Sequence, residues 1–423
     1  MMRISSVTMF EQSSASINRQ QTDFLEVSQQ IASGRRVVNP SDDPQAASRA
    51  VRVDQSKAVT EQYAEARVSV RNSLSQTESI LNSVSDAVTS AKTLMIQASS
   101  DTLSDADRQS VASELRGVYE ALIGQANATD GNGRHLFGGY QDSSAPFVKK
   151  ADGAGGEYID YVGDSNTREQ RIDASRLMKV SENGESIFNS VPSGAGYVAE
   201  AGRFNAAGER VDDNQGSLTF SGPQVIDNAN SDYGESFRVV FTSDTEYSVE
   251  KENTTGGWDT LTSGNTYDPA SSSVSAGGLR LELKGEAVAG DTVEFAPADE
   301  MNTNLFQTFE KALKVLENEA GNPVSPERSA ERRNTLNTVM RELDNSLDNV
   351  LTKRAAVGAR LNELDVVDSV AGNRMLNYEQ TLSDLVDLDY AQAISDYSLR
   401  QVGLQASQKT FADMKGMSLF NYL

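Results

Sequence analysis

The chain has 423 residues, a formal net charge of −23, one His, no Cys and an aromatic content of 7%. The lack of Cys excludes disulfides, thiolate metal sites and cysteine nucleophiles, and a single His excludes any site that needs two imidazoles. The acidic balance argues against nucleic acid or an anionic membrane as the main partner. So few aromatic side chains are unusual for one large core, which keeps an elongated architecture among the options.

The sequence gives no sign of a membrane span or a cleaved secretory signal. No segment approaches the run of about 20 apolar residues that a span requires. The start, Met1-Met2-Arg3, does not lead into an apolar stretch of signal-peptide length. We therefore expect either a cytosolic protein or one that is exported by a route without a cleaved signal.

The first segment is predicted to form a helix that packs along a seam, because apolar residues recur every seven positions at Phe10, Ile17, Phe24 and Ile31. Gly34 is predicted to end it. A second helix is predicted from about residue 44 to 98, with Ser41 or Asp42 capping its free N–H groups and Pro44 in its first turn. Its heptad rows contain Leu74, Leu81, Val88 and Met95, and Thr77, Val84, Ala91 and Ala98.

The centre of the chain is predicted to be a loop-rich β insertion. Ser104 with Asp107 resembles a capping box that opens one more short helix. Beyond it, 23 of the 31 Gly lie between Gly131 and Gly290, and residues 141–300 have a net charge of −16. Alternating apolar runs bounded by turn residues predict strands, at 158–162, 237–241, 247–249, 279–283 and 292–295, with a hairpin at 241–247.

Helices are predicted to return after the β insertion. A short helix over 305–316 precedes the longest heptad series, which runs through Leu336, Leu343, Val350, Val357, Leu364, Ala371, Tyr378 and Leu385. A straight helix drifts by about 20° per heptad, so eight consecutive sevens favour a coiled coil over an ordinary amphipathic helix. The last segment repeats the pattern at Tyr390, Tyr397, Leu404 and Phe411.

These elements predict an elongated α+β fold, with long terminal α-helices in a coiled-coil or helix-bundle rod and an inserted Gly-rich β domain. The chain is predicted to run out along one long helix and return along another, so that its first and last segments meet. Five parts follow: an N-terminal assembly arm at 1–40, two halves of the helical rod at 41–140 and 301–385, the β domain at 141–300, and a C-terminal assembly arm at 386–423.

No catalytic, metal-binding or cofactor-binding constellation emerges. No GxSxG nucleophile elbow accompanies His135. Asp42 and Asp43 are interpreted as helix caps. Asp384, Asp387 and Asp389 could serve acid/base or metal roles, but Asp384 and Asp387, three residues apart on a helix surface, are interpreted as solvated. The acidic stretches 212–216 and 227–234 lack the spacing of a calcium loop, and Gly153–Gly156 lacks the Lys-Ser/Thr of a phosphate loop. Arg35-Arg36 is interpreted as a solvated linker.

The apolar ends of the chain are the strongest functional feature. Apolar termini on a strongly acidic chain need to be buried against something, and we expect burial both within one chain and between subunits. The predicted assembly interface consists of Phe10, Ile17, Phe24, Ile31, Tyr390, Tyr397, Leu404, Phe411, Leu419, Phe420 and Leu423.

The residues between the first two helices resemble the turn that bacterial flagellins share with flagellar hook-associated proteins. The shared elements are Ser33-Gly34, Arg36-Val37 and Pro40-Ser41-Asp42-Asp43-Pro44. Other stretches are similar to the hook–filament junction subgroup, whereas the start lacks the Ile-Asn-Thr-Asn run of flagellins. These stretches are Phe137-Gly138-Gly139-Tyr140, Tyr161-Val162-Gly163-Asp164, 285–292, 304–306 and 419–423.

The resemblance implies a structural adaptor that forms a ring of its own subunits between hook and filament. The implied partners are the other hook–filament junction protein (hook-associated protein 1), flagellin, and an export chaperone that binds the C-terminal arm. The resemblance also implies export through the flagellar type III channel to an extracellular place in the flagellum, with no cofactor. An unfolded chain passes such a channel more easily without disulfides.

Two other functions stay open at this point. The chain could be a flagellin or flagellin-like filament subunit, although its start and its Leu419-Phe420-Asn421-Tyr422-Leu423 ending disfavour this. Its central β domain could also bind an external surface in the manner of an adhesin. An enzymatic role is disfavoured because no convergent site emerges.

Overall fold

A computed structural model describes residues 6–100, 103–151, 156–205, 209–211, 214–317 and 325–416. The chain divides into two compact units. The arm unit comprises Met1–Arg67, Ile172–Ala174 and Asp365–Leu423, and the body unit comprises Val68–Arg171 and Ser175–Leu364. The five predicted parts are each one continuous stretch of sequence, whereas each compact unit combines separate stretches. The five-part division therefore stays a prediction.

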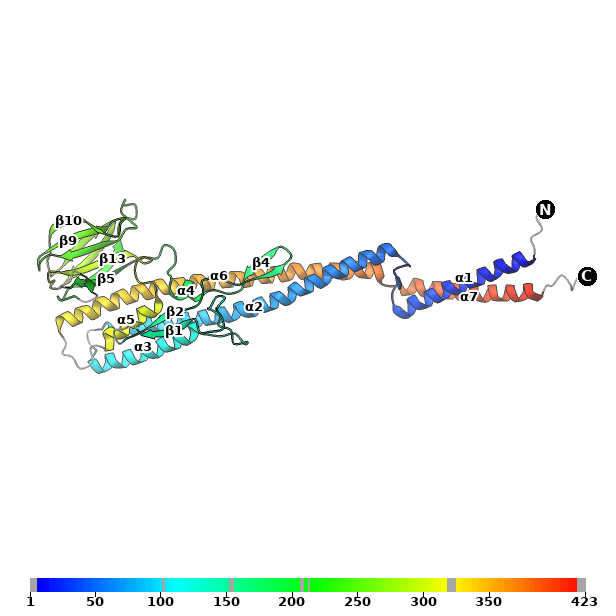
Figure 1. Cartoon of the computed structure of the whole chain (residues 1–423), viewed down its shortest axis with the longest axis horizontal. Coiled ribbons are helices and arrows are strands. Elements are labelled where there is room, and N and C mark those ends of the chain that lie inside the picture. Colours follow the sequence, from blue (N-terminus) through cyan, green and yellow to red (C-terminus); the bar gives the residue numbers. More distant parts are fainter. Residues whose placement is uncertain are drawn as a thin grey trace, which may run out of the picture. The chain divides into compact units, whose positions relative to one another are not determined.

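The arm unit is built from helices. Helix α1 (Ser6–Ser33) and helix α7 (Tyr390–Gly416) lie side by side (Figure 1). The unit also includes the first turns of α2 (Pro44–Ala98) and the last turns of α6 (Pro326–Val386). The four heptad segments of the sequence therefore form four helices, and Gly34 follows the last residue of α1 as predicted.

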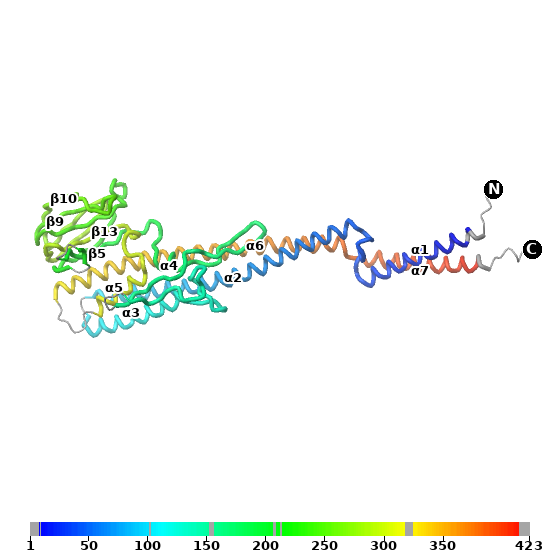
Figure 2. The backbone as a smooth tube through the Cα atoms, viewed as in Figure 1, coloured from blue at the N-terminus to red at the C-terminus, as the bar shows by residue number. Residues whose placement is uncertain are grey.

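In the body unit, α2 and α6 run alongside each other (Figure 2) and bury the predicted heptad rows. Side chains at most 1% exposed line this seam, and the ion pairs Arg354–Glu78 and Lys92–Asp344 flank it. A second row of residues on α6, spaced by seven, is only half-buried, at Met340, Leu347, Arg354 and Leu361. The seam residues are Leu74, Leu81, Val88 and Met95 of α2, and Leu336, Leu343, Val350, Val357 and Leu364 of α6.

Helix α3 (Asp105–Ala126) begins with the predicted capping box. The Ser104 hydroxyl accepts from the Asp107 amide, and the Asp107 carboxylate accepts from the Ser104 amide. Helix α3 packs on α5 (Leu305–Glu317), and a hairpin of β1 (Phe147–Ala151) and β2 (Glu157–Tyr161) joins them. A short α4 (Gly184–Phe188) and a second hairpin, β3 (Glu169–Asp173) with β4 (Arg176–Lys179), were not predicted from the sequence.

Nine further strands form two antiparallel sheets in the body unit. The six-stranded sheet has the order β10-β9-β8-β13-β5-β6, and the three-stranded sheet has the order β11-β12-β7. The predicted strands and the hairpin at 241–247 are confirmed, with Phe241 opposite Tyr247. The strands are β5 (Tyr197–Phe204), β6 (Arg210–Val211), β7 (Thr219–Val225), β8 (Phe237–Phe241), β9 (Glu246–Glu252), β10 (Trp258–Thr266), β11 (Ser272–Ala276), β12 (Leu279–Lys284) and β13 (Asp291–Pro297).

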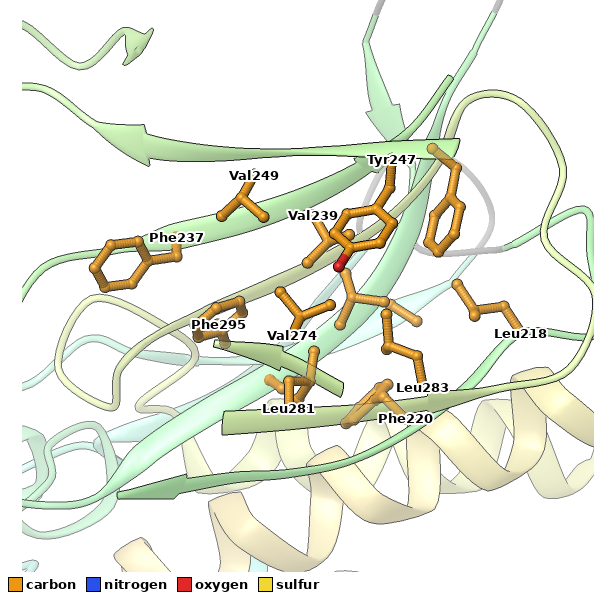
Figure 3. Close-up of a cluster of buried hydrophobic side chains, with 14 of the residues drawn as sticks. Leu218, Phe220, Phe237, Val239, Tyr247, Val249, Val274, Leu281, Leu283 and Phe295 are labelled. Carbon is orange, nitrogen blue, oxygen red and sulfur yellow. The ribbon is translucent and has the colours of Figure 1, made fainter. Parts of the chain in front are cut away.

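The two sheets enclose one apolar core (Figure 3). Strand β12 alternates strictly, with Leu279, Leu281 and Leu283 fully buried and the intervening residues exposed, as period-2 geometry requires. From the larger sheet, Phe237 stacks on Phe295 with ring centroids 5.5 Å apart. The sheets and their shared core therefore form a β-sandwich.

The sandwich is fastened to α5 and α6 by polar side chains. The Asn334 carboxamide accepts from the Phe220 amide (3.1 Å) and donates to the Leu218 carbonyl (2.8 Å), so it pairs with β7 as a neighbouring strand would. Lys311 of α5 donates to Glu342 of α6 (3.1 Å) and to Glu200 of β5 (2.7 Å). Burial raises the pKa of the Glu342 carboxyl, whose side chain is 1% exposed.

Replacing Lys311 by Ala is expected to destabilise the body unit by about 3–5 kcal/mol, because Glu342 would stay buried without its charge partner. Lys314→Ala is the matched control: this Lys is exposed on the same helix, and we expect a change within about 0.5 kcal/mol. Urea unfolding followed by the fluorescence of Trp258, the single Trp and a residue of β10, measures both.

The cost of Lys311→Ala should shrink as the pH falls from neutral. A carboxyl whose pKa is raised on folding binds its proton more readily in the folded state, so acid favours the fold. An equal cost at neutral and at mildly acidic pH, or an equal cost for the control, would contradict the role given to the Lys311–Glu342 pair.

Candidate assembly interface

Helices α1 and α7 pair in opposite directions along the two predicted heptad rows. The ring of Phe10 lies 5.1 Å from that of Phe411, and the ring of Phe24 lies 4.8 Å from that of Tyr397. Two polar contacts flank the rows: Ser407 with Gln20 (2.5 Å) and Arg400 with Asp23 (3.3 Å). The structure therefore brings the first and last segments together, as the sequence predicts.

None of the eight described residues of the predicted interface is fully buried within the chain. Phe10 and Tyr390 are each 51% exposed, and the other six are half-buried. Leu419, Phe420 and Leu423 lie outside the described residues. One helix covers only one side of another, so the rows that α1 and α7 share still present apolar surface to the outside.

Sequence reasoning missed a second apolar surface on α7. Leu399 and Val402 are 69% and 65% exposed, and Ile394 is 54% exposed. They lie outside the heptad row. The signal that could have found them is the presence of three further apolar residues in this helix beside that row. Leu25 of α1 is exposed to a similar extent, at 55%.

Shallow grooves flank the α1–α7 pair. One groove of about 220 Å³ is lined by Gln20, Asp23, Leu399, Arg400 and Gly403. Another of about 230 Å³ is lined by Ser13, Ser16, Ile17, Ala406, Ser407, Thr410 and Phe411. The first groove combines Leu399 and Gly403 with polar and charged side chains. The second combines small residues with the half-buried Ile17 and Phe411, which is the surface that a neighbouring helix can enter with its side chains.

The turn at 33–44, which carries the family resemblance, connects α1 to α2 and is hydrogen-bonded to the connection between α6 and α7. Ser33 ends α1, and Gly34 adopts φ +68°, where a Cβ atom would lie 2.9 Å from the Tyr390 hydroxyl oxygen. The Leu388 amide donates to the Gly34 carbonyl (3.1 Å), and the Arg36 amide donates to the Val386 carbonyl (2.7 Å). The α1–α2 and α6–α7 connections thus form a short antiparallel bridge.

Arg36 is the central side chain of this bridge. Its guanidinium donates to the Leu385 carbonyl in the last turn of α6 (2.6 Å) and to the Asp43 carboxylate (3.2 Å). A cation at the C-terminal end of a helix interacts favourably with the helix dipole. Arg36 lies in an exposed linker, as interpreted from the sequence, but its contact with Leu385, which spans 349 residues of sequence, was not predicted.

The interpretation of Asp43 as a helix cap is confirmed, whereas the alternatives Ser41 and Asp42 do not cap α2. The Asp43 carboxylate accepts from the Ala46 amide (3.0 Å), one of the free N–H groups of the first turn. That hydrogen bond and Arg36 lower the pKa of Asp43. The Asp42 carboxylate instead accepts from the amides of Val38 and Asn39.

The remaining positions of the turn serve the same connection. The Ser41 hydroxyl lies 3.4 Å from the Asp42 carboxylate, and Pro40 is exposed. Pro44 is the first residue of α2, where its lack of an N–H group costs nothing.

The other candidates from the sequence have structural roles. The His135 Nδ1 atom lies 2.8 Å from the Asn127 carbonyl oxygen. Asp389 caps α7 through the amides of Ala391 and Gln392, and Asp384 accepts from Gln380. Asp212, Asp213 and residues 153–155 lie outside the described part of the chain.

The described residues contain neither a metal-binding cluster nor a membrane-spanning helix. No group of three or more His, Cys, Asp or Glu side chains in these ranges lies close enough to hold a metal ion. Likewise, none of the helices described here is both long and apolar enough to cross a membrane.

Known proteins are similar to this sequence over almost its whole length. Residues 4–142 match the family model of the bacterial flagellin N-terminal helical region. Flagellar hook-associated protein 3 of Escherichia coli strain K12 is 32% identical over 419 residues, which is 99% of either chain. The protein of the same name from Salmonella typhimurium strain LT2 is 32% identical over 420 residues, again 99% of either chain.

Solved structures agree with the sequence relatives. FlgL from Xanthomonas campestris matches with a TM-score of 0.62 and 26% identity, over 78% of this chain and 99% of that one. Flagellar hook associated protein-3 from Legionella pneumophila shares the fold with a TM-score of 0.66, over 79% and 98% of the two chains. The chain belongs to the family of flagellar hook-associated protein 3, the structural proteins of the hook–filament junction.

Proposed function

We propose that the chain is a non-enzymatic adaptor that forms a ring of identical subunits through its α1–α7 arm. The observation that carries this proposal is the incomplete cover of the arm: eight heptad residues pair within the chain, yet none of them is fully buried. Exposed apolar surface of this extent in an acidic chain is typical of a protein–protein interface. Neighbouring copies of the same arm supply the missing cover.

The five predicted parts then have distinct roles. The arms at 1–40 and 386–423 assemble, the helical halves at 41–140 and 301–385 stiffen the subunit, and the segment 141–300 faces solvent. Solvent is where its net charge of −16 is least costly. Leu419, Phe420 and Leu423 belong to the same interface in this proposal.

Membership of the family supports the partners that we propose. One side of the ring contacts the other hook–filament junction protein, hook-associated protein 1, and the other side contacts flagellin. An export chaperone holds the C-terminal arm before assembly, because Leu399 and Val402 would otherwise promote aggregation. The chain leaves the cell through the flagellar export channel without a cleaved signal and resides outside the cell.

The Arg36 bridge is proposed to set the direction of the arm. A single loop between α1 and α2 would leave the arm free to swing, whereas two connections that hydrogen-bond to each other have few alternative arrangements. Arg36 serves both the C-terminal end of α6 and Asp43 at the start of α2. The bridge therefore lets subunits present their arms in one orientation, which ring closure requires.

The ring proposal is tested by complementation of a bacterium that lacks its own gene for this chain. Without the gene, electron microscopy should show hooks without filaments, and flagellin should accumulate in the medium. The full chain should restore filaments. A chain without residues 404–423 should not, because it lacks Leu404 and Phe411, while urea unfolding of its body unit stays unchanged. Normal filaments with the truncated chain would refute the role of the arm.

Substitution of exposed residues separates assembly from folding. Leu399→Ser with Val402→Ser is expected to abolish filament attachment while leaving helix content by circular dichroism unchanged, because both side chains are mostly exposed in the single chain. Gln405→Ser, also exposed on α7, is the matched control and should swim normally. Equal behaviour of the double variant and the control would exclude this surface from the interface.

Loss of the Arg36 side chain is expected to loosen the bridge locally. Arg36→Ala removes two charge-assisted contacts, so the Leu388 amide should exchange its hydrogen about five-fold faster, which corresponds to about 1 kcal/mol. Arg35→Ala is the neighbouring control with its side chain also exposed. Hydrogen exchange measured by mass spectrometry on 385–390 decides the matter: identical exchange in both variants would remove Arg36 from its central role.

A further inference from the structure

Two short motifs that lie 24 residues apart in sequence are joined by hydrogen bonds in the body unit. We call this pair of interlocked loops the knot, although the chain is not threaded through itself. The knot comprises residues 137–142 and 161–164. The Tyr161 hydroxyl oxygen lies 3.0 Å from the Phe137 carbonyl and 2.8 Å from the Asp164 carbonyl. In return, the Tyr140 amide donates to the Asp164 carboxylate (3.0 Å), and the Asp164 amide donates to the Gly138 carbonyl (3.3 Å).

The glycines of the knot allow contacts that no other residue permits. Gly139 has φ +65°, and a Cβ atom there would lie 2.4 Å from the Asp164 carbonyl oxygen. A Cβ atom at Gly163 would lie 2.6 Å from the Tyr161 ring. Since backbone and side chains are this closely interlocked, the loop is already ordered before it meets any partner, and the entropy cost of binding is low.

The knot holds one large aromatic side chain out into solvent. Tyr140 is 61% exposed, and the nearby Val162 is 36% exposed. The other aromatic residues of the two motifs, Phe137 and Tyr161, turn inward. An ordered loop that presents an exposed Tyr has the character of a binding hot spot, because Tyr offers a large contact area with little conformational freedom to lose.

The same unit contains an open groove of about 510 Å³ between α2 and α6. Its lining is mostly apolar or small, with Arg354 and Glu78 paired at one side (2.9 Å). Leu351 is 42% exposed there. The residues that line it are Glu78, Leu351, Arg354, Ala355, Gly358, Leu361 and Asn362. This volume accommodates an aromatic side chain, and the Arg354 guanidinium offers it a cation–π contact.

Knot and groove lie on opposite flanks of α6. The knot is joined to the segment 182–190 through a β-bridge from Gly138 to Asn183. That segment covers the flank of α6 that carries Asn349 and Arg360, by the contacts Asn349–Ile187 (2.9 Å) and Arg360–Glu182 (2.6 Å). Leu351 and Asn362 line the groove, and each lies two residues after Asn349 or Arg360 in the sequence. On a helix with 3.6 residues per turn, two residues correspond to a rotation of about 200°, so the groove faces the opposite flank.

We propose that Tyr140 of one copy inserts into the α2–α6 groove of the next copy. The phenol hydroxyl donates to Glu78, and the ring packs between Arg354 and Leu351. A knob on one flank and its groove on the other make a head-to-tail contact, which closes into a ring when copies repeat it around an axis. This contact rests on the proposed ring, and it names a body-unit interface that is separate from the arms.

Cysteine crosslinking tests the contact in assembled flagella, without background because the chain has no Cys. Gln141→Cys and Asn362→Cys place one thiol beside the knob and one at the groove while leaving Tyr140 in place, and both residues are exposed. In cells complemented with the double variant, a short bismaleimide should give a ladder of covalent oligomers of this chain. Each single variant, and Gln141→Cys combined with Ser110→Cys on α3, should give none.

The aromatic ring is tested on the same background. Tyr140→Ala should lower the crosslinked fraction at least ten-fold, and Tyr140→Phe should retain most of it. Attached filaments without a ladder would overturn this contact while the proposed function stands. A ladder that Tyr140→Ala leaves unchanged, or crosslinks to a different flagellar protein, would likewise overturn it. Failure of even the unmodified chain to restore filaments would instead overturn the proposed function.

Discussion

Two α-helices packed side by side bury side chains along a single line of contact, and the arm unit depends on this constraint. Phe10, Phe24, Tyr397 and Phe411 meet along that line, yet the same residues keep part of their surface exposed. In the body unit, α3, α5 and the β1–β2 hairpin add further cover, and the seam from Leu74 to Met95 is sealed. Among its described residues the arm has no such third layer, and in the proposed ring neighbouring copies supply it.

Polar contacts to backbone atoms fix the parts of the chain whose apolar contact is limited. Arg36 reaches the Leu385 carbonyl, and Asn334 pairs with the backbone of β7. Each of these side chains forms hydrogen bonds with backbone N–H or C=O groups that a helix end or a sheet edge would otherwise leave without a partner. Because such hydrogen bonds need a defined geometry, they select one arrangement of neighbouring elements, where apolar packing alone would tolerate several.

The sequence predicts what depends on local pattern. The bounds of α2, the capping box at Ser104 and the alternation of β12 follow from neighbouring residues, and the structure confirms them. The sequence left the cap of α2 open among Ser41, Asp42 and Asp43, which are all good caps, and only the path of the loop selects Asp43. Of the candidate interface, the heptad rows were predictable, but Leu399 and Val402 depart from the repeat. Their exposure depends on where α1 lies.

The knot shows why motif and contact are different kinds of information. The sequence offers Phe137–Tyr140 and Tyr161–Asp164 as two separate stretches of one family resemblance, each with glycine and aromatic residues, and it does not indicate that they touch. Their joint role appears only when Asp164 is seen to bind the Tyr140 amide and to occupy the space that a Cβ atom at Gly139 would need. In the first motif, Phe137, Gly138 and Gly139 then support the position of Tyr140. These contacts fix the loop, yet the side chain of Tyr140 stays exposed and adds little to the packing of its own chain. A role against a partner surface explains this arrangement.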